Sequence, residues 1–203
     1  MGSDDNGATQ GTPAEVLAQA FLHYPSMDWA FEGESDAEQL RKLVITYDAL
    51  LDAVQRYGGV VHASDGTGAL LWLPGTHFPL GLWRELWTSI AALPFRIGFH
   101  ATKRLSDHED ESIDYIVTHG TKSTMGVIWN VGVAPAGRGK GHCRDMVRRA
   151  IDAMRADGLR EFWLATDAAV NVAIYEKLGF EVVHKRVVRC SGIQSWVMRQ
   201  VIE

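Results

Sequence analysis

The segment from residue 127 to residue 180 constrains the fold of this chain more than any other part of it. It contains an apolar run, a glycine-rich loop, an amphipathic stretch, a second apolar run and a second short helical stretch. This order predicts strand, loop, helix, strand and helix, with a first strand that is buried on both faces. The two strands are expected to run parallel, joined by a crossover through the helix that is expected to be right-handed.

The glycine-rich loop has the composition of an anion-binding turn. Gly137, Gly139 and Gly141 allow positive φ and close backbone approach, so consecutive N–H groups can converge on an anion at the start of a helix. Arg138 and Lys140 add positive charge. We therefore expect the loop to bind a pyrophosphate.

Two other nucleotide-binding loops fail on spacing. A Walker loop has Ser or Thr after its Lys, whereas Lys140 is followed by Gly141. A dinucleotide-binding fingerprint needs a glycine three residues after its second glycine, and His142 and Arg144 stand at those positions instead.

Two motifs in this segment resemble those of the GCN5-related N-acetyltransferase (GNAT) superfamily. The first resembles the superfamily's Arg/Gln-x-x-Gly-x-Gly/Ala loop, and here it is Arg138-Gly139-Lys140-Gly141-His142-Cys143, with Cys143 in the final small-residue position. The second is Tyr175-Glu176-Lys177-Leu178-Gly179-Phe180. Residues 69–75 and Asn171 are also similar to a branch that includes puromycin N-acetyltransferases.

The resemblance implies an α/β fold: a mixed, mostly antiparallel central sheet with flanking helices and splayed fourth and fifth strands, the acyl-CoA N-acyltransferase fold. It implies acetyl-CoA as cofactor, CoA as product and no metal. The cofactor-binding residues that it implies are Val131 and Val133 for the pantetheine backbone contacts, Arg138, Gly139, Lys140, Gly141, His142 and Cys143 for the pyrophosphate, and Asn171 for a pantetheine hydrogen bond. The commoner superfamily position for that Asn, seven residues before the Tyr, is Ala168 here.

The resemblance gives Tyr175 the role of the acid that protonates the departing CoA sulfur. The other interpretation is a core tyrosine with a satisfied hydroxyl. The implied reaction is transfer of an acetyl group to a primary amine in a ternary complex, with a small-molecule acceptor. A protein N-terminus or lysine is the alternative acceptor, and a non-catalytic acyl-CoA-sensing module is the alternative function.

The sequence assigns no general base. Asn130 is a polar residue inside an apolar strand, and it must bond a neighbour or face the acceptor. Other residues with the right chemistry precede that strand, namely Glu109, Glu111, Asp114 and His119. Acidic residues on a helix usually form a solvated face, so none of them stands out.

Composition limits the partners. A net charge of −5 and a pI near 5.9 argue against a nucleic-acid partner. Cys143 and Cys190 are the two cysteines, and neither they nor the eight histidines show metal-ligand spacing. The sequence contains no apolar run that is long enough to indicate a membrane partner. We expect a cytoplasmic location and leave homodimerisation open.

The rest of the chain predicts one acetyltransferase domain over residues 12–203, after a disordered tail of residues 1–11. Helices are expected over residues 13–23, with Pro25 ending the first, and over residues 36–57. A hairpin of residues 60–63 and 69–73 and two antiparallel strands, residues 180–188 and 193–198, complete the sheet.

The stretch after the hairpin is longer than a minimal acetyltransferase needs, and we expect it to set acceptor specificity. Pro94 and Gly98 suggest two helices, and Ser106 is expected to cap a third. Trp72, Trp83 and Trp87 suggest either pocket walls or core, and their helical spacing favours core.

Overall fold

Six strands form one sheet in the order β1-β2-β3-β4-β6-β5. The computed structural model describes residues 11–202. The strands are β1 (Gly59–His62), β2 (Gly68–Pro74), β3 (Met125–Val133), β4 (Glu161–Thr166), β5 (Glu181–Val187) and β6 (Gln194–Val201). β3 and β4 run parallel, and the other four neighbouring pairs run antiparallel. The expected mixed, mostly antiparallel sheet is confirmed.

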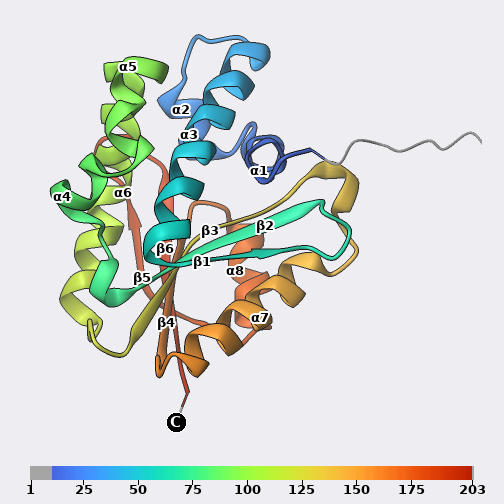
Figure 1. The fold of residues 1–203 in the computed structure, drawn as a ribbon, viewed down its shortest axis with the longest axis vertical. Helices are drawn as coiled ribbons and strands as arrows, with labels where there is room; N and C mark the ends of the chain where they lie inside the picture. The colour runs from blue at the N-terminus through green and yellow to red at the C-terminus, as the bar shows by residue number, and fades with distance from the viewer. Residues whose placement is uncertain (1–10, 203) are drawn as a thin grey trace, which may run out of the picture.

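Helices cover both faces of this sheet (Figure 1). The α-helices are α1 (Pro13–Phe21), α2 (Pro25–Ala30), α3 (Asp36–Tyr57), α4 (Gly81–Leu86), α5 (Leu93–Ile97), α6 (Phe99–His119), α7 (His142–Ala156) and α8 (Ala169–Glu176). Three single turns of 3₁₀ helix are η1 (Gly75–His77), η2 (Ser89–Ala92) and η3 (Pro135–Gly137).

Alternation along the strands divides the core into two clusters. Leu71, Leu73 and Val127 face the side covered by α1, α3 and α6. Leu70 and Ile128, one position away, face the side covered by α7 and α8. Both faces of the central strands are thus buried, which explains why β2 and β3 are apolar almost throughout.

Local capping signals place the first long helices where the sequence predicts them. Thr12 forms a capping box with Glu15, in which the Glu15 N–H donates to Thr12 Oγ1 at 3.3 Å and the Thr12 N–H donates to Glu15 Oε2 at 2.7 Å. The Ser35 side chain accepts from the Glu38 N–H and caps α3. Pro25 does not merely end a helix: it occupies the first turn of α2, which the sequence analysis missed.

The segment between β2 and β3 differs from its prediction. α6 is one continuous helix of 21 residues, and Ser106 lies inside it rather than at its N-cap. The reason is a buried stripe, formed by Ala101, His108, Ser112 and Ile116, that passes Ser106 without a break. Tertiary packing of this stripe overrides the local capping signal.

The tryptophan prediction holds for one residue of three. Trp72 is buried at 7% exposure, whereas Trp83 and Trp87 on and after α4 are 77% and 72% exposed. The expected core role is therefore wrong for Trp83 and Trp87. They do not line the cavity described below.

The sequence also predicts a disordered N-terminal tail and no membrane partner. The predicted tail falls outside the described residues apart from Gly11. Within residues 11–202, no helix combines the length and the apolar character needed to cross a bilayer.

The sheet core predicts a large stability difference between two leucines. Leu71 is fully buried in β2, and Leu82 is 69% exposed on α4. Leu71→Ala leaves a cavity and should lower the free energy of unfolding by about 2 to 5 kcal/mol. Leu82→Ala should change it by less than about 0.5 kcal/mol. Urea unfolding of both variants measures this, and equal losses would contradict the assigned packing.

Candidate functional site

The site begins where β3 and β4 separate. The two strands pair at Met125, Gly126 and Val127 of β3, and the register does not continue beyond Val127 within the described residues. β3 itself runs on to Val133, paired along its other edge with β2. The edge of β3 that faces β4 is thus available to a ligand over the second half of β3. The strands that the resemblance describes as the splayed fourth and fifth strands correspond to β3 and β4 here.

A β-bulge lies at the same place. Leu71 and Trp72 are consecutive in β2, but they pair with Asn130 and Ile128, so Trp129 is the extra residue of β3. Bulges redirect side chains next to active sites. Here Trp129 and Asn130 both line a cavity of about 100 Å³ beside the diverging strands.

The glycine loop at the end of β3 has an open, left-handed backbone. Gly139 has φ 79° and Gly141 has φ 84°, and a Cβ at Gly139 would meet nothing within 4 Å. Gly141 precedes α7, whose N-terminus has no side-chain cap. Unpaired N–H groups at the start of a 15-residue helix fit a phosphate. The backbone of the loop therefore suits the pyrophosphate of a CoA molecule.

Gly137 is required for a reason other than the expected positive φ. A Cβ at this position would lie 2.0 Å from Thr67 Oγ1 in the turn between β1 and β2. Gly137 therefore allows the loop to pack closely against the hairpin turn.

The same turn supplies a residue that the sequence analysis missed. Asp65 Oδ2 lies 3.1 Å from Lys140 Nζ and 2.9 Å from His142 Nε2. The hydroxyl and N–H of Thr67 donate to the other carboxylate oxygen, and these bonds hold the pKa of Asp65 well below its ordinary value. Two basic side chains of the loop are thus turned toward the hairpin. Arg138 is exposed, and its Nε donates to the Val133 carbonyl at 3.4 Å.

Cys143 lies at the start of α7, and its side chain packs against the core on the α7 side of the sheet. Burial raises the pKa of its thiol to about 11, so the thiol is protonated at neutral pH. A contact with the cofactor would therefore come from its backbone N–H rather than from a thiolate.

Tyr175 and Asn171 lie on α8, one turn apart, and both line the cavity. Tyr175 is buried, and burial together with the neighbouring Cys143 and Tyr24 holds the pKa of its phenol well above the ordinary value. The phenol therefore keeps its proton at neutral pH. The Asn171 amide donates to Thr166 Oγ1 at 3.1 Å, which fixes its orientation beside the ends of the splayed strands.

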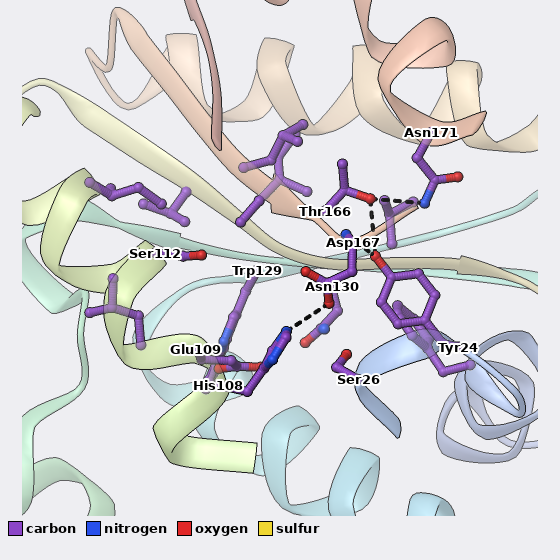
Figure 2. A pocket seen from close by; sticks show the side chains of 18 of the residues that line it. Tyr24, Ser26, His108, Glu109, Ser112, Trp129, Asn130, Thr166, Asp167 and Asn171 are labelled. Carbon is purple, nitrogen blue, oxygen red and sulfur yellow. Dashed lines mark hydrogen bonds and ion pairs between the residues drawn. The ribbon is translucent and has the colours of Figure 1, made fainter. Parts of the chain in front are cut away.

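The opposite wall of the cavity comes from α6 and the α1–α2 region (Figure 2). His108, Glu109 and Ser112 come from α6, and Tyr24 and Ser26 come from the turn before α2 and its first residues. The stretch after the hairpin thus contributes to the cavity, through α6.

A buried hydrogen bond between His108 and Asp167 joins this wall to the end of β4. His108 Nε2 lies 3.0 Å from Asp167 Oδ2, and His108 Nδ1 lies 2.9 Å from Ser191 Oγ. The Asp167 N–H donates to the Tyr24 hydroxyl at 2.6 Å, and that hydroxyl lies 3.0 Å from Thr166 Oγ1. These bonds hold α2, α6 and the start of α8 in one arrangement around the cavity (Figure 2).

Glu109 is the acidic residue of α6 that reaches the cavity. Burial, together with the negative charges of Asp167 and Asp110, raises the pKa of its carboxyl to about 7, against the opposing effects of His108 and of a hydrogen bond from Trp129. Glu111, Asp114 and His119, which the sequence ranked equally with it, do not line this cavity. Within residues 11–202, no three His, Cys, Asp or Glu side chains gather in an arrangement that could hold a metal ion.

Comparison with known proteins agrees with this geometry. Residues 113–183 match the family model described as an acetyltransferase (GNAT) domain. Arylalkylamine N-acetyltransferase 2 from Aedes aegypti is similar in structure, with a TM-score of 0.56 and 15% identity, over 94% of this chain and 93% of that one. The fold is therefore the acyl-CoA N-acyltransferase fold. Residues 113–183 thus resemble a GNAT domain in sequence, and the whole described chain shares the fold.

Other matches are shorter. The ribosomal-protein-S18-alanine N-acetyltransferase from Escherichia coli is 25% identical with a TM-score of 0.35, over 39% of this chain and 55% of that one. A GCN5-related N-acetyltransferase from Kribbella flavida is 23% identical with a TM-score of 0.36, over 41% and 54%. The chain thus spans about half the length of these two structures. No curated protein matches the chain.

The loop geometry predicts how one substitution affects CoA binding. Gly139→Asp places a carboxylate in the open space of the loop and should weaken CoA binding at least about tenfold, because like charges repel. Isothermal titration of CoA measures this.

Gly192→Asp is the matched control, because Gly192 also has positive φ (71°) and open space around its Cβ position but lies in the turn between β5 and β6. It should leave CoA affinity unchanged. Equal affinities of the two variants and the parent would show that the loop does not hold the cofactor.

Proposed function

We propose that the protein is an acetyl-CoA-dependent N-acetyltransferase that moves an acetyl group to the primary amine of a small molecule, by direct transfer in a ternary complex. One observation carries this proposal. A single cavity brings together Val131, Asn171 and Tyr175, expected to contact acetyl-CoA, and the polar wall of α6. The thioester and the acceptor would therefore meet in one place, as direct transfer requires.

The walls of the cavity favour a small acceptor. α2 and α6 both contribute to the cavity opposite the diverging strands, and the hydrogen bond between His108 and Asp167 ties α6 to the end of β4. A small amine fits a cavity of about 100 Å³ more readily than a protein segment does. Phe21, Tyr24, Phe78 and Trp129 among the lining residues favour an amine with an apolar or aromatic body.

The chain itself supplies four functions in this proposal. The N–H groups at the start of α7 and Arg138 bind the pyrophosphate, and the free edge of β3 orients the pantetheine. A backbone N–H near Val131 polarises the thioester carbonyl. Tyr175 holds the proton that the departing sulfur takes up.

An amine panel tests the proposed function. Purified protein is incubated with acetyl-CoA and with small aliphatic amines, small aromatic amines, a peptide with a free N-terminus and a lysine-containing peptide, and release of the CoA thiol is followed. We expect acetylation of at least one small amine. Acetylation of the peptides alone would show that the acceptor is a protein rather than a small molecule. CoA binding without thiol release in the presence of any of these acceptors would favour the acyl-CoA-sensing alternative.

Tyr175→Phe tests the role of the phenol. The variant removes one proton donor and should lower turnover about a hundredfold, while CoA affinity and folding stay as in the parent. Steady-state rates are compared under conditions where chemistry limits the rate.

Tyr57→Phe is the control, because Tyr57 lies at the end of α3 and does not line the cavity. If Tyr175→Phe keeps the rate of the parent, Tyr175 serves packing and the sulfur takes its proton from another source.

A further inference from the structure

Two side chains that can accept hydrogen bonds line the cavity where the amine substrate is expected to bind. Asn130 Oδ1 is buried and has no hydrogen-bond partner among the described residues, although it lines the cavity. Glu109 brings a carboxylate to the same cavity from α6. A buried acceptor without a donor calls for a ligand that supplies one. A primary ammonium group, with three N–H donors and a positive charge, fits both groups.

The surroundings of Glu109 come from four elements. His108 and Asp110 neighbour it on α6, Asp167 approaches from the loop between β4 and α8, and Tyr47 approaches from α3. Trp129 of β3 donates a hydrogen bond to the carboxylate. Because burial dominates these influences, the pKa of Glu109 lies at about 7, where a carboxyl group can both take up and release a proton at neutral pH.

The other acidic and basic groups nearby are already engaged or lie elsewhere. Asp167 is paired with His108. Glu111 Oε2 lies 3.1 Å from Arg186 Nε. The His119 ring stacks on Tyr115 at 4.0 Å between centroids, and Asp114 is exposed. Glu109 therefore combines access to the cavity with a carboxylate that no ion pair occupies in the described structure.

We propose that Glu109 is the general base for the acceptor, which Asn130 Oδ1 helps to hold. This inference rests on the proposed function. Glu109 takes one proton from the ammonium, and the neutral amine then attacks the thioester carbon. The new C–N bond replaces the C–S bond, the sulfur takes the proton of Tyr175, and the second proton lost by the nitrogen restores Tyr175. Glu109 finally releases its proton to solvent.

The pH dependence of the parent and of Glu109→Gln tests this role. In the parent, kcat/KM for a strongly basic amine should fall as the pH drops below about 7, because the protonated carboxyl cannot act as a base. Glu109→Gln keeps the size of the side chain and an oxygen for Trp129, so folding and CoA affinity should stay unchanged. Its rate at pH 7 should fall about a hundredfold or more.

A weakly basic amine, already neutral at pH 7, makes the test specific. With such an acceptor Glu109→Gln should lose less than about tenfold, because no proton need be removed before attack. Asp114→Asn is the matched control on α6, since Asp114 is exposed and lies outside the cavity lining. It should keep the pH profile and the rates of the parent with both amines.

The outcomes separate the two proposals. If Glu109→Gln loses the same factor in rate with both amines, or has the pH profile of the parent, Glu109 is not the base. The proposed function still stands in that case as long as the parent acetylates an amine. A parent that transfers acetyl to no amine overturns the proposed function and the base role with it. If Glu109→Gln fails to bind CoA or to fold, Glu109→Asp is measured in its place. Its rate should still fall more with the strongly basic amine than with the weakly basic one.

Discussion

The short pairing between β3 and β4 is the constraint on which the site depends. A parallel ladder that ran the full length of β3 would saturate the edge that faces β4 and would close the space between the two strands. Pairing ends at Val127, and the bulge at Trp129 turns consecutive side chains of β3 toward the opened space. Sheet geometry thus creates a free strand edge and a cavity at one place, without a loop insertion into either strand.

Sequence patterns with local causes predicted their structures well. The capping residues Thr12 and Ser35 fixed the starts of α1 and α3, and the glycine loop formed before α7 as expected. The continuous apolar runs of β2 and β3 predicted strands, because each is buried on both faces. The roles of Tyr175 and of the loop residues stay predictions, although the structure brings Tyr175, Asn171 and Val131 to one cavity.

Features with distant causes could not be predicted. Glu109 lies within the run His108-Glu109-Asp110-Glu111, which is typical of a solvated helix face, but it interacts with Trp129 and Tyr47 on other elements. Asp65 follows the same rule, since its partners Lys140 and His142 lie far along the chain. Neighbouring sequence carries no sign of either contact. A clue did exist in Asn130, whose polar side chain inside an apolar strand indicated an unmet partner.

The position of α6 in the chain has a consequence for how such a protein can change. The glycine loop, α7 and α8 follow β3, whereas α6 and its carboxylate belong to a segment that leaves the sheet after β2 and returns at β3. The strands at these two junctions, β2 and β3, are antiparallel neighbours in the middle of the sheet. Exchange of residues 75–124 would therefore replace the α6 wall of the cavity together with the Glu109 carboxylate, while the segment from β3 to α8, in which the proposed donor site lies, is kept.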